Sequence, residues 1–386
     1  MTGLDRVTAC HCERFLRSNP AAWLLCICTA IMVGFTSARC GNAPKHDFSV
    51  IAYYNGHGRG LDSIPAGKIT HIIYSFLHLK GNRLALNGPA DSAGIARLVA
   101  LKEQNPRLKV LVSLGGWGGC APCSEAFSTA AGREEFTRSA LDILERFHAD
   151  GIDLDWEYPA IEGYPGHVFT PADRHNFTLL LRALRASFGD RYKLSFAAGG
   201  FTRCLLASYE WREISPLVDL VNVMTYDLVN ANSPTTGHLA PLYASAGQTE
   251  SAANDVRLLD SLGVPRAKIV IGAAFYARLW EDVPDTNNGL FQKGRFYRFI
   301  PYRHLGEYLQ EHGGFRTYLD TAAGASYSYS ARERVFATYD DIRSVAGKTA
   351  YALTMHLGGV MFWELSGDLP DHPLLDAIDS VRTSRP

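Results

Sequence analysis

Short apolar runs alternate along the chain with segments whose apolar residues follow helical spacing. Runs rich in Val, Ile, Phe and Tyr are typical of strands buried on both faces, and their alternation with amphipathic segments predicts an α/β fold with parallel strands. The eight runs interpreted as strands are residues 49–54, 71–77, 109–114, 151–156, 193–198, 218–225, 268–275 and 359–364. Eight strand–helix units in a chain of 386 residues favour a closed (β/α)8 TIM barrel over the open doubly wound sheet that periodicity alone also permits.

Two predicted helices have a clear apolar face. The first, between the third and fourth strands, carries Phe136, Ala140, Ile143, Leu144 and Phe147. The second, between the fourth and fifth strands, has a helix-start pattern at 170–173 and Gly189 placed to end it. Its apolar face comprises Phe177, Leu180, Leu181, Leu184 and Phe188. Each helix would return the chain to begin another parallel strand.

One interval breaks the strand–helix rhythm. Residues 281–340 lack a helical stripe and are rich in Tyr, Phe, Arg and Gly. We interpret them as a small α+β insertion between strands seven and eight, because a long decorative loop would leave its aromatic residues without packing partners. The predicted organisation is therefore 39–280 for barrel strands one to seven, 281–340 for the insertion, and 341–386 for strand eight and a C-terminal helix. An insertion that leaves the C-terminal end of a strand would form one wall of a barrel active site.

The N-terminal segment 1–38 differs from the rest of the chain. Arginines precede an apolar stretch at 21–38 that ends in small residues, which is typical of a secretory signal peptide cleaved after Ala38. The stretch is also near the lower length limit for an uncleaved membrane anchor. Either interpretation predicts that the main domain is exported, to the extracellular space or the periplasm.

Cleavage after Ala38 would leave Cys40, Cys120, Cys123 and Cys204 in an oxidising compartment, where disulfides persist. Cys120 and Cys123 form a lone C-x-x-C motif. Because no second such motif and no paired histidines supply further zinc ligands, a structural disulfide or free thiols are favoured over a metal site. The sequence does not choose among the possible pairings.

Composition narrows the class of ligand. The chain is 47% hydrophobic and 20% charged, as in ordinary globular proteins, and its formal net charge is -1. No long run of one charge is present, so nothing favours the phosphate contacts that dominate nucleic-acid binding. A neutral partner is the simpler expectation.

The segment 150–158 carries the main candidate chemistry. Because side chains alternate along a strand, Asp153, Asp155 and Glu157 should face the barrel interior, while the apolar residues between them face the helices. Carboxyl groups about 6.5 Å apart in a partly desolvated barrel cannot all ionise without strong repulsion, so at least one should retain its proton near neutral pH. A retained proton is what a general acid requires. Glu157, the last of the three, would lie nearest the cleft, with Asp155 behind it.

Two other interpretations of these acids are weaker. Carboxylates also hold Mg²⁺ or Ca²⁺, but such sites usually recruit ligands from several loops. Three acids buried in an apolar strand for purely structural reasons would carry a large desolvation cost. We therefore predict catalysis without a metal or other cofactor.

The motifs resemble those of the glycoside hydrolase family 18 chitinases. The signature D-G-x-D-x-D-x-E matches residues 150–157, the stretch 109–117 is similar to the family's third strand with its S-x-G-G pattern, Met224-Thr225-Tyr226-Asp227 matches M-x-Y-D, and 358–364 resembles the last strand with its tryptophan. The insertion is similar to that of the family's deep-cleft chitinases. The resemblance spans nearly all of the chain after residue 38.

The resemblance implies hydrolysis of β-1,4-linked N-acetylglucosamine chains by a retaining, substrate-assisted mechanism. Glu157 would protonate the leaving oxygen, Asp155 would orient the acetamido group, Asp153 would couple to Asp155, and Tyr226 would donate to the acetamido oxygen. The substrate-binding residues that it implies are Met224, Asp227 and Trp363 around the distorted sugar and Trp117 on the leaving-group side. Tyr54, Ser113, Tyr276 and Arg278 are further candidates for the cleft.

Rival functions are a chitin-binding relative without catalysis, an endoglycosidase acting on N-glycans, and a peptidoglycan-acting enzyme. The acid Glu157 is present, which disfavours the first; the insertion disfavours the second; and the lack of internal repeats disfavours the third. We expect a monomer whose partner is chitin or its oligosaccharides, with membrane contact only through the N-terminal segment if that segment stays uncleaved. Endo or exo action, the end of the chain that is held, and the preferred chain length stay open.

Overall fold

The computed structural model describes residues 48–55 and 63–384. The predicted signal peptide at 1–38 and Cys40 therefore lie outside the described residues. Within the described part of the chain, no helix has the length and apolar character needed to cross a membrane.

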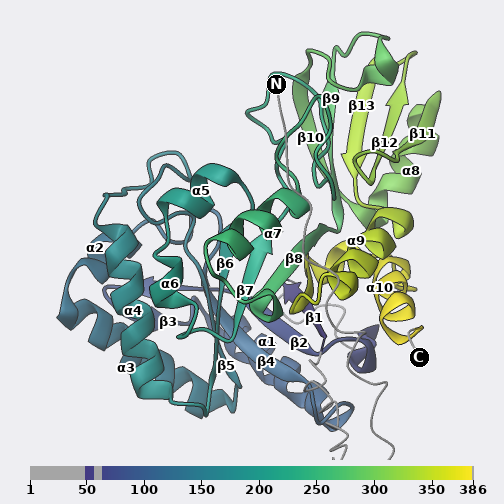
Figure 1. The fold of residues 1–386 in the computed structure, drawn as a ribbon. Helices are drawn as coiled ribbons and strands as arrows, with labels where there is room; N and C mark the ends of the chain where they lie inside the picture. Colours follow the sequence, from purple (N-terminus) through teal and green to yellow (C-terminus); the bar gives the residue numbers. More distant parts are fainter. Residues whose placement is uncertain (1–47, 56–62, 385–386) are drawn as a thin grey trace, which may run out of the picture. The chain divides into compact units, whose positions relative to one another are not determined.

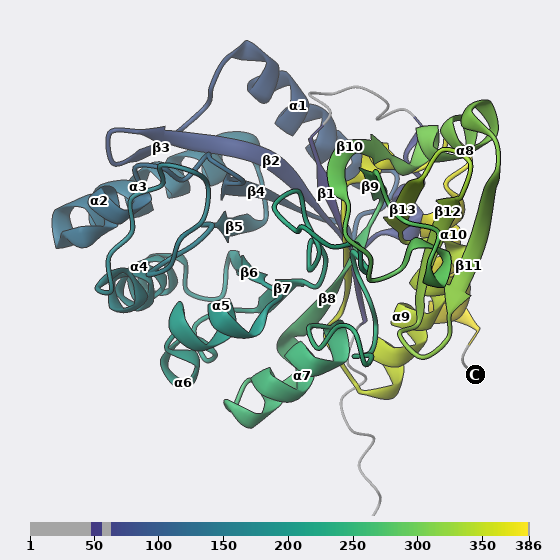
Figure 2. The same cartoon turned by 90° about the horizontal axis from the view of Figure 1, so that it is seen from above.

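Parallel strands form a closed barrel, as predicted from the apolar runs. The strands follow the order β1-β2-β4-β5-β6-β7-β8-β14, and β1 pairs with both β2 and β14. Their bounds are β1 Ser49–Tyr54, β2 His71–Lys80, β4 Lys109–Gly115, β5 Gly151–Asp155, β6 Lys193–Gly199, β7 Leu220–Met224, β8 Ile269–Ala274 and β14 Gly359–Trp363. Figure 2 looks onto this barrel, with the helices outside the ring of strands. Pairing of the first strand with the last confirms the (β/α)8 barrel and excludes the open sheet.

Helices return the chain between successive strands. Their bounds are α1 Pro89–Ala100, α2 Cys123–Ser128, α3 Ala130–Phe147, α4 Asp173–Phe188, α5 Thr202–Ala207, α6 Trp211–Ile214, α7 Ala252–Ser261, α9 Ile342–Thr354 and α10 Pro373–Thr383. Helix α3 begins after Thr129, whose side chain accepts a hydrogen bond from Gly132 N. Helix α4 ends at Gly189, which has a φ of 53° that favours glycine. The apolar faces predicted for these helices are buried, except that Phe147 at the end of α3 is only partly buried.

Alternation along the strands separates two apolar layers. On β1, Val50, Ala52 and Tyr54 belong to the large cluster between the strands and the helices, whereas Ile51 and Tyr53 belong to a cluster inside the barrel. The inner cluster also includes Met224 and Tyr226 and has Trp363 packed against it. Since the predicted site residues come from the ends of the strands, this inner cluster forms the floor on which the site is built.

An antiparallel sheet with one helix is inserted between β8 and β14. Its strand order is β10-β9-β13-β12-β11. The bounds are β9 Tyr276–Glu281, β10 Arg295–Pro301, α8 Tyr302–His312, β11 Phe315–Asp320, β12 Ala325–Ser330 and β13 Val335–Tyr339. The short strand β3 Arg83–Ala85 is not part of this sheet and pairs with the end of β2 in the barrel. Figure 1 shows the inserted sheet in green beyond the end of β8. The predicted α+β insertion is thus present, and its first strand starts at Tyr276, directly after β8.

The insertion has its own apolar clusters. One lies between α8 and the sheet and includes Leu279, Leu305 and Ala337, and the other is built around Trp280 and Phe336. Most of the aromatic residues noted in the sequence pack against these clusters, namely Phe291, Phe296, Tyr302, Phe315 and Tyr318. Tyr297 and Phe299 are exposed instead. Packing by most of these side chains explains why the insertion folds as a sheet rather than as an open loop.

Cys120 and Cys123 are joined by a disulfide, and Cys204 is a buried free thiol. The C-x-x-C motif therefore serves as a local structural bridge. It lies at the start of α2, in the segment that follows β4.

Phe177 is a direct test of the layer between strands and helices. Its ring packs against Trp156, Phe196 and Tyr209 with centroid distances of 6.2, 5.2 and 5.4 Å. We expect Phe177→Ala to lower the free energy of unfolding by about 3 to 5 kcal/mol, because the change leaves a cavity in a closely packed core. Urea denaturation followed by tryptophan fluorescence measures it. Leu206→Ala, on the exposed side of α5, is the control and should change stability by less than about 0.5 kcal/mol; a similar loss in both variants would contradict the assigned layer.

Candidate active site

The three acids of the β5 segment point into the barrel, as predicted. Asp153 and Asp155 belong to β5 and Glu157 follows its end. The residues that alternate with them, Ile152, Leu154 and Trp156, belong to the apolar layer beneath the helices. The strand thus divides its side chains into an acidic inner set and an apolar outer set.

Asp153 lies deepest and accepts hydrogen bonds from four other strands. Tyr53 Oη and Ser113 Oγ donate to Oδ2, each at 3.0 Å. Ser195 Oγ donates to Oδ1 at 2.6 Å, and Asn222 Nδ2 donates to the same oxygen at 3.1 Å. Burial raises the pKa of Asp153, while these donors act in the opposite direction because they favour the ionised form. Asp153 is therefore the carboxyl group best equipped to carry a negative charge.

Asp155 receives less support from hydrogen-bond donors than Asp153 does. Its Oδ1 is buried and has no hydrogen-bond partner within the described residues. Burial, the charge of Glu157 and the charge of Asp153 raise the pKa of Asp155 well above its usual range. A carboxyl group in this position holds a proton or awaits a donor from a ligand.

Glu157 is partly buried where the strand opens to the cleft. Burial raises its pKa to about 7, the hydroxyl of Tyr158 lowers the pKa by donating a hydrogen bond, and the charge of Asp227 raises it. A carboxyl group with a pKa near neutrality can both give and take a proton under the same conditions. Glu157 therefore has the property required of the predicted general acid.

Asp227 joins the barrel to the insertion. Its carboxylate accepts from Arg278 Nε at 2.6 Å and Arg278 Nη2 at 2.7 Å, and from Tyr276 Oη at 2.8 Å. Asp227 follows β7, whereas Tyr276 and Arg278 lie on β9 of the insertion. These three predicted binding residues thus form one network beside Glu157, and the insertion supplies a wall of the site.

An apolar floor lies beside the acids. Met224, Tyr226 and Tyr276 belong to one cluster, and Trp363 packs against it. The ring of Trp363 stacks on Phe76 at a centroid distance of 5.4 Å and 15° between planes. Among the residues that the structure describes, the hydroxyl of Tyr226 has only the thioether of Met361 as a partner, at 3.8 Å. Since a thioether is a weak acceptor, this hydroxyl is available to a ligand.

Trp117 lies beyond the end of β4 and is 56% exposed. It makes an edge-to-face contact with Tyr164, itself exposed, at a centroid distance of 5.8 Å. An exposed aromatic pair is suited to stacking on a flat apolar face of a ligand. Its role in binding the leaving group stays a prediction.

The glycines of the S-x-G-G pattern bring this loop close to β5. Gly115 and Gly116 have φ values of 112° and 81°, which favour glycine, and Gly116 N donates to the backbone oxygen of Asp155 at 2.9 Å. A Cβ on Gly115 would lie 2.1 Å from that same oxygen. Glycine is thus required here for the close approach of the two chains.

The placement of Tyr54 in the cleft was wrong. Its side chain is buried in the layer between strands and helices, and its neighbour Tyr53 points inward to Asp153 instead. The period of two along a strand allows only one of two successive residues to face the interior.

Sequence reasoning also missed Tyr53, Ser195, Asn222, Tyr158 and Phe76. Serine and asparagine within otherwise apolar strands, Ser195 on β6 and Asn222 on β7, were a signal that could have identified two of them.

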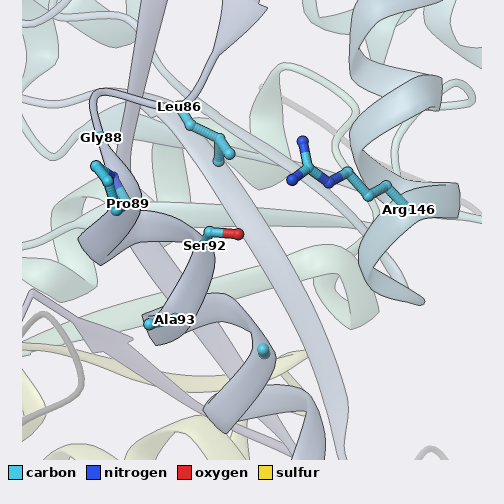
Figure 3. Close-up of a pocket in the computed structure, with 7 residues that line it drawn as sticks. Leu86, Gly88, Pro89, Ser92, Ala93 and Arg146 are labelled. Atoms are coloured by element: carbon cyan, nitrogen blue, oxygen red, sulfur yellow. The ribbon is translucent and has the colours of Figure 1, made fainter.

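Other possible sites are less suited to chemistry. The described residues contain no group of three or more His, Cys, Asp or Glu side chains placed to hold a metal ion. A surface pocket is lined by Leu86, Gly88, Pro89, Ser92, Ala93, Ala96 and Arg146. Figure 3 shows Arg146 extending toward Leu86 in this pocket. It contains no carboxyl group and none of the predicted site residues.

A parallel (β/α)8 barrel with crowded acids at the end of its fourth barrel strand, β5, and an aromatic floor defines a class of glycoside-cleaving enzymes. The sequence profile of Glycosyl hydrolases family 18 matches residues 49–368, and the chain belongs to this family.

Three similar proteins illustrate the relationship. Chitinase A1 of Niallia circulans is 36% identical over 302 residues, which cover 72% of this chain and 43% of that relative. The structure of a family 18 N-acetylglucosaminidase from Paenibacillus barengoltzii has a TM-score of 0.78 at 36% identity, covering 86% of this chain and 99% of the other. The Group IV chitinase of Ostrinia furnacalis in complex with allosamidin has a TM-score of 0.80 at 27% identity, covering 87% and 99%.

The pKa of Glu157 is open to a direct test. We expect Asp227→Asn to lower this pKa below its value of about 7, because the change removes a negative charge that disfavours ionisation of Glu157 and leaves Arg278 unpaired nearby. Carbon NMR of glutamate-labelled protein measures the titration, and the signal missing in Glu157→Gln assigns it. Asp142→Asn, an exposed site paired with Arg83, is the control and should leave the titration unchanged. A Glu157 titration near pH 4.5 in the unmodified protein would contradict the assigned environment.

Proposed function

We propose that this protein is a secreted chitinase that hydrolyses β-1,4-linked N-acetylglucosamine chains with retention, using the acetamido group of the substrate as the nucleophile. The observation that carries the proposal is that Glu157 retains a proton near neutral pH while the pKa of its neighbour Asp155 is raised well above the usual range. Neither group is therefore poised as the ionised second carboxylate of an ordinary two-carboxylate mechanism. Asp227 is held by Arg278 and Tyr276, and Asp153 is held by four donors. The family membership and the similarity to chitinases support the same conclusion.

The positions of these groups support the following first half-reaction. Glu157 donates its proton to the glycosidic oxygen, the bond from that oxygen to the anomeric carbon breaks, and the acetamido oxygen forms a bond to the anomeric carbon. Asp155 Oδ1, which has no partner in the described part of the chain, accepts a hydrogen bond from the acetamido N–H and stabilises the positive charge of the oxazolinium intermediate. Tyr226 donates its hydroxyl to the acetamido oxygen and fixes its direction of attack.

The second half-reaction uses the same groups. Glu157, now ionised, takes a proton from water, and the resulting hydroxide oxygen attacks the anomeric carbon. The oxazolinium ring opens, the acetamido group is restored, and Glu157 recovers its proton. Asp153 assists Asp155 in both half-reactions. Its four hydrogen-bond donors stabilise a negative charge on Asp153, next to the position where positive charge develops.

Release of single N-acetylglucosamine units is a second candidate for the mode of action. The similarity to the N-acetylglucosaminidase of Paenibacillus barengoltzii favours it. The exposed Trp117–Tyr164 pair favours binding of longer chains instead, because it adds a stacking surface beyond the end of β4. The products formed first from a long oligosaccharide distinguish the two.

Export to an oxidising compartment is also proposed. The disulfide between Cys120 and Cys123 supports it, because such bonds persist mainly outside the cytosol.

Glu157→Gln tests the catalytic role together with the choice of substrate. We expect this change to lower kcat on N-acetylglucosamine oligosaccharides by about 10²- to 10⁴-fold, because Gln cannot donate an acid proton. Binding of the same oligosaccharides, measured by calorimetry, should change by less than about tenfold, because Gln has nearly the same shape as Glu. Product chromatography over time gives kcat.

Fully deacetylated oligosaccharides are the matched substrate control. The unmodified protein should not cleave them, because they lack the nucleophile. Equal cleavage of acetylated and deacetylated chains would refute acetamido participation, and undiminished activity of Glu157→Gln would refute the role of Glu157.

A further inference from the structure

The chain crosses between barrel and insertion at two neighbouring points. It leaves the barrel where β8 ends at Ala274 and β9 begins at Tyr276, and it returns where β13 ends at Tyr339 and α9 begins at Ile342. Asp340 lies on the return crossing. Its side chain joins the two crossings to each other.

Asp340 makes three buried hydrogen bonds. Its Oδ2 accepts from the backbone N of Ala274 at 2.9 Å and from Lys348 Nζ at 2.5 Å. Its Oδ1 accepts from Ser344 Oγ at 2.7 Å. The side chains of Asp340 and Lys348 are each only 1% exposed. Charged side chains are almost never fully buried unless they are paired, as Asp340 and Lys348 are here.

The position held by Asp340 is adjacent to the candidate site. Ala274 pairs with Trp363 across β8 and β14, and Phe275 N donates to the backbone oxygen of Trp363 at 2.9 Å. Two and four residues beyond Ala274, the side chains of Tyr276 and Arg278 hold Asp227. A shift of the chain at Ala274 would therefore move both the aromatic floor and the wall beside Glu157.

Stability alone is a poor explanation for the ion pair. Burial of two charges carries a desolvation cost, and apolar side chains of similar volume often stabilise a fold equally well. Burial lowers the pKa of Lys348, which shows that the interior disfavours its charge. Asp340 does what an apolar side chain cannot, since it accepts a hydrogen bond from the backbone where the chain leaves the barrel.

We propose that Asp340 and Lys348 are positioning residues that fix the start of β9, so that Tyr276 and Arg278 meet Asp227 beside Glu157. The kinetic part of this proposal rests on the proposed chitinase function. Lys348 neutralises and orients Asp340, and Asp340 holds Ala274. The insertion is thereby attached to the barrel in one orientation.

Two double variants separate positioning from stability. Asp340→Leu with Lys348→Met removes both charges and the acceptor for Ala274 N. Asp340→Asn with Lys348→Met removes both charges and keeps an acceptor oxygen, and it serves as the matched control. Thermal denaturation shows whether each variant folds.

The Leu/Met variant should fold and lose the position of β9. We expect amide hydrogen exchange in 276–281 to be about tenfold faster or more, and kcat/KM on N-acetylglucosamine oligosaccharides to fall by about 10- to 100-fold, because small displacements of positioning groups have large effects on rate. The alkaline limb of the pH profile should move to lower pH, because Asp227 raises the pKa of Glu157 only while it is held nearby. The Asn/Met variant should stay within about threefold of the unmodified protein in exchange and kcat/KM, because its acceptor remains.

Unchanged exchange in 276–281 for a folded Leu/Met variant would overturn the proposal, as would an Asn/Met variant as impaired as the Leu/Met variant. If the Leu/Met variant does not fold, Ser344→Ala is the milder test, because it removes one bond from Asp340 and leaves the ion pair. This change also removes half of the capping box of α9, so exchange at the start of α9 is recorded as the control. Faster exchange in 276–281 supports positioning in that variant, and unchanged exchange overturns it. Exchange needs no substrate, so failure of the chitinase function and failure of this proposal are distinguishable.

Discussion

Unequal hydrogen bonding of three neighbouring carboxyl groups is the constraint on which the site depends. Asp153 receives four donors from four other strands. Among the described residues, Asp155 Oδ1 is buried without a donor, and Glu157 receives a hydrogen bond from Tyr158. Repulsion and desolvation oppose ionisation of the less supported groups. Negative charge is thus favoured at the bottom of the strand and a proton at its open end.

The closed barrel makes this distribution possible. Tyr53, Ser113, Ser195 and Asn222 lie on β1, β4, β6 and β7, and only closure of the sheet directs all of them at one carboxylate of β5. The insertion also affects the pKa of Glu157. Its Tyr276 and Arg278 hold Asp227, and the charge of Asp227 raises that pKa. The pKa of Glu157 therefore depends on both the barrel and the insertion. The junction between these two parts of the fold thus affects the proton-donating group of the site.

Much of this fold could be predicted because buried parallel strands are continuous apolar runs. The run at 49–54 matched β1 and the run at 193–198 matched most of β6. Strict alternation along β5 likewise predicted which acids face inward. Local patterns do not, however, give the register between strands distant in the chain. Three of the four donors to Asp153, namely Tyr53, Ser195 and Asn222, were missed for this reason. Tyr54 was wrongly placed in the cleft because no local signal indicated which of Tyr53 and Tyr54 faced the interior.

The contact between Asp340 and Ala274 was beyond prediction for the same physical reason. The spacing of Asp340, Ser344 and Lys348 fits one face of the segment around α9. Nothing in that segment, however, identifies Ala274 N at the end of β8 as the donor to Asp340. The role of polar residues buried where the chain crosses between barrel and insertion can be assigned only when both crossings are placed in three dimensions.

The anomeric form of the first product tests the account most directly. Proton NMR recorded during the first minutes of hydrolysis of an N-acetylglucosamine oligosaccharide distinguishes the two anomers before they equilibrate. Acid catalysis by Glu157 with the acetamido group as nucleophile predicts that the β-anomer forms first. Initial formation of the α-anomer would mean direct attack by water on the opposite face and would contradict the account.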